Sequence, residues 1–153
     1  DLWNISDDKI LEKLLKRNEF EIWNAKSDVS DNNIINKNYK NPNWDEEECI
    51  LALDLYYKIF KKIDSIDERN ETIIELSNFL NIRGSAININ KNDNFRNPLG
   101  VYRKLLNFLS IDKPNHVKSK ENRSKTDELV WKKFANNKQL LEESAKKIYN
   151  KFR

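Results

Sequence analysis

The segment 43–62, NWDEEECILALDLYYKIFKK, constrains the fold of this chain more than any other. Three Glu stand in its first turn, where the helix dipole favours negative charge, and Asn43 or Asp45 is placed to cap it. Its apolar residues cover a wide face of the helix, so we expect this helix at the centre of a core. The apolar positions are Trp44, Ile50, Leu51, Leu53, Leu55, Tyr56, Ile59 and Phe60.

Further helices are predicted on the C-terminal side of this segment. Residues 67–81 have an amphipathic pattern, and residues 97–110 begin with Asn97 as N-cap and Pro98 in the first helical position. Residues 126–151 predict one or two helices that start at Thr126 or Asp127. Residues 82–95 and 112–125 read as polar loops, the first compatible with a short β-ribbon arm. We therefore predict an all-α fold with a helix-turn-helix-like three-helix core at about 43–110 and additional N- and C-terminal helices.

Residues 1–41 are expected to form a separate N-terminal helical region. Residues 6–17 predict a helix, residues 18–24 a short strand or extended segment, and the Asn-rich residues 25–43 a connector. This places a domain boundary near residue 41, so that the second domain covers residues 42–153. Because the chain starts at Asp1 and contains no Met, we expect it to be part of a longer protein.

Composition excludes most enzyme classes. The single cysteine, Cys49, and the single histidine, His116, cannot supply a disulfide framework, a multi-Cys zinc site or two-histidine chemistry, and two glycines cannot form a phosphate loop. The Asp45–Glu48 carboxylates point in different directions on a helix and are interpreted as a dipole-favoured first turn. No apolar run is long enough to cross a membrane. We expect no catalytic centre, no metal and no cofactor in this chain.

Charge is distributed unevenly along the sequence. Residues 43–81 carry 4 basic and 10 acidic side chains, whereas residues 82–125 carry 10 basic and 3 acidic ones. A polyanion would approach the positive side of such a dipole. The competing interpretation is an AT-rich coding bias that inflates Lys everywhere without a functional surface.

The helix at 97–110 is the candidate reading element. Arg103 and Asn107 are four residues apart, opposite the apolar stripe, and these two residue types match the edges of guanine and adenine. Basic residues flank this helix on both sides, as a phosphate clamp requires. The predicted DNA-binding residues are Arg96, Asn97, Gly100, Arg103, Lys104, Asn107, Lys113, Lys118, Lys120 and Arg123.

Four strings in the chain resemble an accessory domain on the amino-terminal side of HNH-type and modification-dependent restriction endonucleases. They are NPNWDEEECILALDLYYKI, IIELSNFLN, NFRNPLGVYRKLLNFLSID and DELVWKKFANNKQLLEESAKKI, and the resemblance covers about residues 42–150. It implies a non-catalytic module that recognises double-stranded DNA, with or without modified bases, in a cytoplasmic bacterial phage-defence nuclease. The cutting chemistry would lie elsewhere, because a second histidine for an HNH site is missing here.

Two other functions stay open at this point. One is a protein-interaction module that docks the nuclease part or another subunit. It would be favoured if Trp44, Tyr57 or Trp131 formed an exposed apolar patch while Arg103 and Asn107 were buried or ion-paired. The other is an enzyme acting on nucleic acid within this segment, which the absent acid–lysine pair of metal-dependent nucleases disfavours.

Overall fold

The computed structural model describes residues 39–115 and 123–153, and this part of the chain contains helices and no strand. The predicted all-α fold class is confirmed for these residues. Contacts divide the chain into two compact units between Lys40 and Asn41, and nearly all described residues belong to the second unit. The helix predicted at 6–17 and the extended segment predicted at 18–24 lie outside the described residues.

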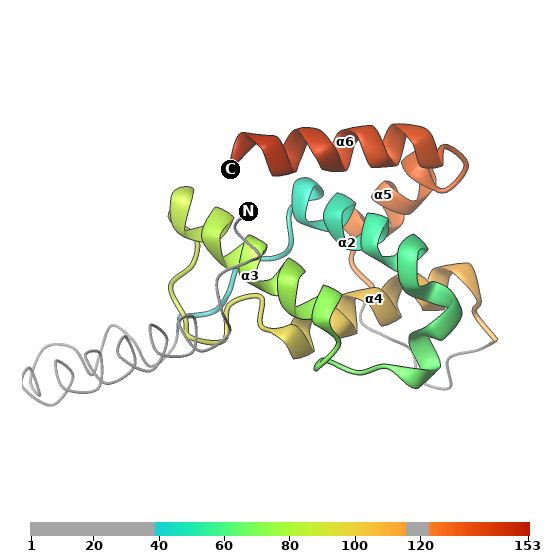
Figure 1. Cartoon of the computed structure of the whole chain (residues 1–153), viewed down its shortest axis with the longest axis horizontal. Coiled ribbons are helices and arrows are strands. Elements are labelled where there is room, and N and C mark those ends of the chain that lie inside the picture. Colours follow the sequence, from blue (N-terminus) through green and yellow to red (C-terminus); the bar gives the residue numbers. More distant parts are fainter. Residues whose placement is uncertain (1–38, 116–122) are drawn as a thin grey trace, which may run out of the picture. The chain divides into compact units, whose positions relative to one another are not determined.

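The described part of the second unit is built from helices (Figure 1). They are α2 (Glu46–Ile59), the 3-10 helix η1 (Phe60–Ser65), α3 (Glu71–Ala86), α4 (Pro98–Asp112), α5 (Lys125–Phe134) and α6 (Lys138–Lys151). The segment predicted to hold one or two C-terminal helices therefore forms two. Their first N-cap is Ser124 rather than Thr126 or Asp127, with Asp127 completing a capping box.

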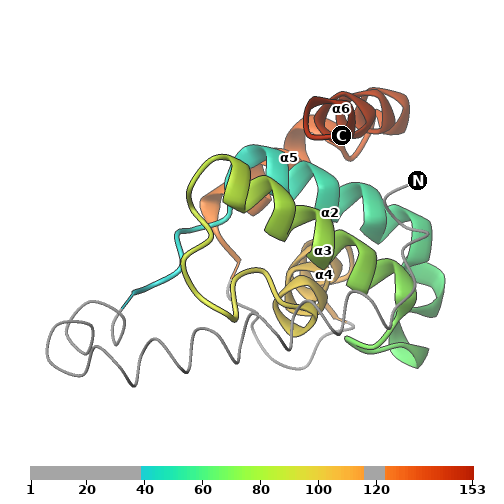
Figure 2. The same cartoon turned by 60° about the vertical axis from the view of Figure 1, so that its left-hand side comes forward.

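Helix α2 occupies the centre, as its apolar composition predicts. Ten of its 14 residues are buried, and it packs against α3, α4, α5 and α6. Figures 1 and 2 show α6 on one side of α2 and α4 on the opposite side. Asp45 caps the helix by accepting the Glu48 N–H at 2.9 Å, while the Glu48 side chain accepts the Asp45 N–H. This capping box confirms Asp45 as one of the two predicted caps.

The loop predicted at 82–95 is shorter than expected, because α3 continues to Ala86. Gly84 lies inside the helix against the fully buried Phe95 ring, and a Cβ at this position would stand 2.5 Å from Phe95 Cε1. Glycine is required here by close packing rather than by a turn. The helix ends next to Asn88, which has a positive φ of 63°. Residues in this left-handed conformation commonly follow the end of a helix. Turns follow up to α4, and no β-ribbon forms at AININ.

Some apolar residues assigned to buried stripes are on the surface instead. Ile74 of α3, Leu129 of α5 and Leu140 of α6 are 38, 66 and 39 % exposed. The helices carrying them were predicted correctly, but the width of each buried face depends on how many neighbours pack on it. Leu129 is the most exposed of these side chains and lines a surface hollow described below.

Candidate nucleic-acid interface

Arg96, predicted to hold phosphate, is an internal structural residue. Its Nε and Nη2 donate to the two carboxylate oxygens of Glu48 at 2.6 and 3.0 Å, and Nη2 also donates to the carbonyl oxygens of Pro42 and Asn43. The guanidinium stacks 5.1 Å from the Trp44 ring centroid. This network holds the Arg96 backbone at a positive φ of 43° and fixes the start of α2 against the turn before α4. The predicted phosphate contact by Arg96 is wrong.

Lys104 and Asn107 are also buried, each with 7 % exposure. Lys104 Nζ lies 2.9 and 3.1 Å from the Asp127 carboxylate oxygens, and Asn107 Nδ2 donates to Asp127 Oδ2 at 3.3 Å. Asp127 itself is completely buried and also accepts from Cys49 Sγ at 3.3 Å. The prediction that this side of α4 faces outward is wrong, because α5 packs on it. Helix α4 has two covered sides, one against α2 and α3 and the other against α5.

The predicted start of α4 is confirmed, but its groups are engaged. The Asn97 side chain accepts the Gly100 N–H at 2.8 Å, and Pro98 occupies the first helical position. The Gly100 N–H is therefore not available to a phosphate, because the helix cap already uses it. Asn97 and Gly100 serve to begin the helix in the described structure.

Three predicted residues do remain on the surface. Arg103, Lys113 and Arg123 are exposed, and Arg103 and Arg123 form no ion pair within the described residues. Lys113 lies with its Nζ 5.5 Å from the Phe60 ring centroid. Lys118 and Lys120 lie outside the described residues, as does His116.

The predicted site left out the cations of α5, although Lys125 belongs to the basic residues that follow the 97–110 helix. Lys125 and Lys132 are exposed and, like Arg123 before them, form no ion pair among the described residues. The sequence signal was present in the repeat of Lys at helical spacing along 125–133. Whether these lysines are available to a partner depends on which side of α5 is exposed, and the spacing alone does not determine this.

The charge asymmetry of the sequence is compensated in part by ion pairs inside the fold. Arg83, from the basic segment, is buried and binds Asp45 at 2.9 Å and Glu47 at 3.0 Å, both from the acidic segment. Burial by itself would raise the pKa of Glu47, but hydrogen bonds from Lys151 and Arg83 lower it below its usual value. Two cations of the basic segment, Arg83 and Arg96, are therefore partners of the acidic segment, which weakens the argument for a polyanion from net charge.

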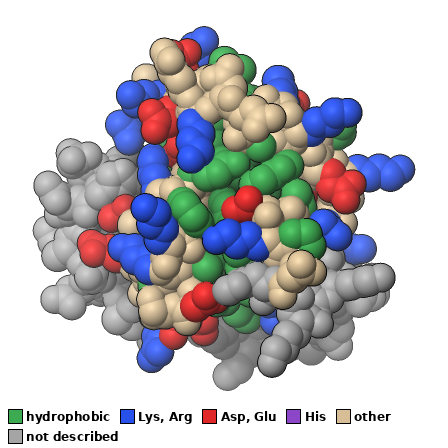
Figure 3. Space-filling model, turned by 90° about the vertical axis from the view of Figure 1, so that its right-hand side faces the viewer, with side chains coloured by type: hydrophobic (Ala, Val, Ile, Leu, Met, Phe, Trp, Pro, Cys, Tyr) green, Lys and Arg blue, Asp and Glu red, His purple; other side chains and the backbone are tan. Residues whose placement is uncertain are grey.

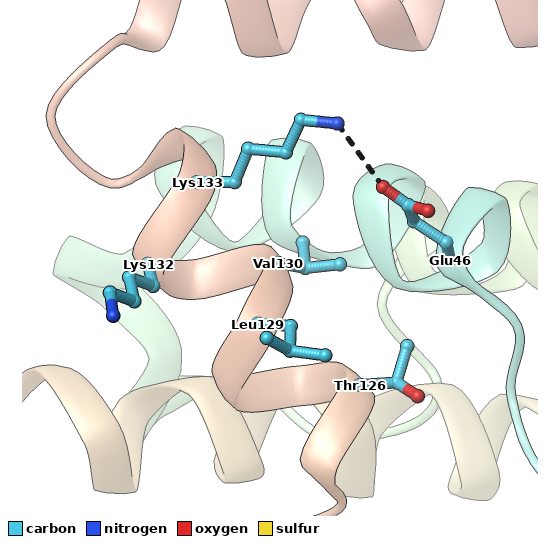
Figure 4. Close-up of a pocket in the computed structure, with 6 residues that line it drawn as sticks. All are labelled: Glu46, Thr126, Leu129, Val130, Lys132 and Lys133. Atoms are coloured by element: carbon cyan, nitrogen blue, oxygen red, sulfur yellow. Dashed lines mark hydrogen bonds and ion pairs between the residues drawn. The ribbon is translucent and has the colours of Figure 1, made fainter.

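A hollow of about 570 Å³ lies between α5 and the first turn of α2 (Figure 4). It is lined by Glu46, Thr126, Leu129, Val130, Lys132 and Lys133. Lys133 reaches across to Glu46 at 3.3 Å, whereas Lys132 points away from this pair (Figure 4). The hollow is open to solvent and contains one carboxylate and two ammonium groups, a set suited to surface contact rather than to acid–base chemistry.

The aromatic residues named by the docking alternative gather in part. Tyr57 and Trp131 stack with ring centroids 5.8 Å apart, and both are half-buried. Trp44 is half-buried elsewhere, beneath Arg96 and Lys104. Of the docking condition, the burial of Asn107 is met. Tyr57 and Trp131 are half-buried rather than exposed, and Arg103 is exposed, so the condition is not met as a whole.

A metal-binding cluster and the single cysteine are two candidate sites of chemistry in the described part of the chain. No group of three or more His, Cys, Asp or Glu side chains there is placed to hold a metal ion. Burial raises the pKa of the Cys49 thiol far above its usual value, and the Asp127 charge adds to this effect. This is the environment of a packed cysteine and not of a nucleophile.

Comparisons with protein families, curated proteins and solved structures find no match to this chain. In addition, no helix of the described residues has the length and apolar character needed to cross a membrane.

Proposed function

We propose that the second unit binds double-stranded DNA as a non-catalytic module of a larger restriction or defence protein, contacting mainly the phosphate backbone. One observation carries this proposal: Arg103, Arg123, Lys125 and Lys132 are exposed, without an ion pair among the described residues, around the junction of α4 and α5. We call these four residues the junction cations. The resemblance of the sequence to restriction accessory domains points to the same partner.

The junction cations come from adjoining parts of two packed helices. Arg103 precedes Lys104, whose ammonium binds Asp127, and Asp127 lies in the first turn of α5 close to Arg123 and Lys125. Positive side chains presented by two neighbouring elements are suited to contacts with phosphates of a duplex. This contact depends on charge and position and needs little base recognition.

Weak sequence preference follows from the same geometry. Of the two residues expected to face bases, Asn107 donates to Asp127 inside the protein, and only Arg103 remains on the outer side of α4. A single exposed Arg on a helix supplies at most one bidentate contact to a guanine edge. In this proposal, α4 and α5 serve mainly to hold the cations in place.

A salt titration tests the proposal. The full chain is titrated with a fluorescent duplex at several salt concentrations. Four phosphate contacts predict that log K falls with log salt at a slope of about −3.6, since each contact contributes about −0.9. The Lys125→Ala/Lys132→Ala variant should reduce the magnitude of the slope to about 1.8.

The matched control is Lys146→Ala/Lys147→Ala, which removes the same charge from exposed positions on α6. It should leave the slope close to that of the parent chain. A slope near zero for the parent, or equal effects of the two double variants, would rule out a defined phosphate surface at the junction.

A further inference from the structure

A second surface feature is formed by three half-buried aromatic rings, Tyr57, Phe60 and Trp131, which we call the aromatic patch. Trp131 of α5 stacks on Tyr57 of α2, and both rings, like Phe60, approach the buried Tyr56 ring with centroids 5.6 to 6.3 Å apart. Figure 3 shows hydrophobic side chains gathered in the middle of the face where the ends of α2 and α4 come to the surface beside α5.

Two lysines lie at the edge of the aromatic patch. Lys138 Nζ lies 4.8 Å from the Tyr57 ring centroid, and Lys113 Nζ lies 5.5 Å from that of Phe60. Both lysines are exposed. The Asp112 carboxylate accepts the hydroxyl of Tyr56 at 2.6 Å and is thereby engaged within the protein. The patch therefore combines apolar area with two positive charges held in place by ring contacts.

We propose that the aromatic patch is a docking site for an acidic linear peptide segment of a partner protein, with an apolar anchor residue between its carboxylates. The anchor would cover the exposed edges of Trp131 and Tyr57, and the flanking carboxylates would meet Lys113 and Lys138. Aromatic rings with a cationic border supply both parts of such recognition, since buried rings provide affinity and the charges select the partner.

The ring arrangement argues against single-stranded nucleic acid as the occupant. Stacking of bases needs free aromatic faces. One face of Tyr57 is covered by Trp131 at an interplanar angle of 27°, and Lys138 lies over the ring, while Lys113 lies over Phe60. What these rings offer a ligand is mainly their edges, which suit an aliphatic or aromatic side chain of a peptide.

The experiment is a selection of random displayed peptides of about 12 residues on the full chain, followed by binding measurements with the enriched sequence as a labelled synthetic peptide. The enriched peptides should carry two or more carboxylates around one apolar residue. Lys113→Glu/Lys138→Glu should weaken binding by at least about tenfold, because both contacts become repulsive. The control Lys146→Glu/Lys147→Glu, with the same charge change on α6, should stay within about twofold.

Several results would overturn this assignment. They are a failure to enrich any peptide, a consensus without acidic residues, and an equal loss in both charge-reversal variants. A labelled oligothymidylate that binds the parent and is lost in the charge-reversed patch variant would assign the surface to single-stranded DNA instead. The Lys125→Ala/Lys132→Ala variant should bind the peptide normally, so failure of the duplex proposal and failure of this one are distinguishable.

Discussion

Replacing Lys104 by Met separates a structural from a DNA-contacting role for the lysine in the middle of α4. Its ammonium is 2.9 and 3.1 Å from the oxygens of the fully buried Asp127. Removing one partner of a buried ion pair costs about 3–5 kcal/mol. The Asp127 carboxylate would keep the Asn107 amide, the Ser124 N–H and the Cys49 thiol as donors, so we expect a loss near the lower end, about 3 kcal/mol.

The assay is urea unfolding followed by far-ultraviolet circular dichroism. The Lys104→Met/Asp127→Asn double variant serves as control, because Asn at position 127 is neutral and still accepts the cap hydrogen bond from Ser124. The double variant should recover about 2 kcal/mol of the loss, as coupled buried partners do. Under conditions where Lys104→Met is folded, its duplex affinity should equal that of the parent.

A different outcome would refute the reasoning. If the free energy of unfolding of Lys104→Met lies within about 0.5 kcal/mol of that of the parent chain, the ammonium makes no important internal contact. If it also reduces the salt slope of duplex binding by about 0.9, Lys104 contacts phosphate, as the sequence alone suggested.

Two further predictions concern single side chains. Gly84→Ala should destabilise the protein by about 1–3 kcal/mol, because the added methyl overlaps the Phe95 ring, whereas Gly100→Ala, with a nearest contact of 3.1 Å, should stay within about 0.5 kcal/mol in the same unfolding assay. Burial raises the pKa of Asp54 above its usual value, although Lys58 opposes this. The stabilising contribution of protonated Asp54 is therefore lost as pH rises through the raised pKa, so Asp54→Asn should gain stability relative to the parent between about pH 3 and pH 7. A constant difference across this pH range would contradict the direction of the shift.

The string from Asn97 to Leu109 is explained in large part by folding requirements. Asn97 and Pro98 begin α4, and Lys104 and Asn107 bind Asp127. Its buried apolar residues are Val101, Leu105, Phe108 and Leu109. The buried polar contacts demand defined partners, so they restrict the sequence as strongly as a binding site would. A specific motif is therefore compatible with a fold requirement, and function has to be sought at exposed positions, such as Arg103 within the string and the cations of α5 outside it.

The helices could be predicted from the sequence because their signals are local. Capping residues, the position of Pro98 and the 3.6-residue spacing of apolar side chains act within one or two turns. The positions of the helix ends were harder to predict from the sequence. Helix α3 continues through Gly84, where the missing side chain leaves room for the ring of Phe95, eleven residues further along the chain. Contacts of this kind carry no local signature.

The amino-acid sequence by itself determined an all-α protein organised around the helix at 46–59, because hydrophobic periodicity and helix caps fix local structure and its most buried element. Only the tertiary structure decided which polar side chains are available to a partner. Helix α5 covers the side of α4 that holds Lys104 and Asn107, and the acidic first turn of α2 binds Arg83 and Arg96. A charged side chain is free for recognition only if no opposite charge from a distant segment reaches it, and that depends on packing of the whole chain.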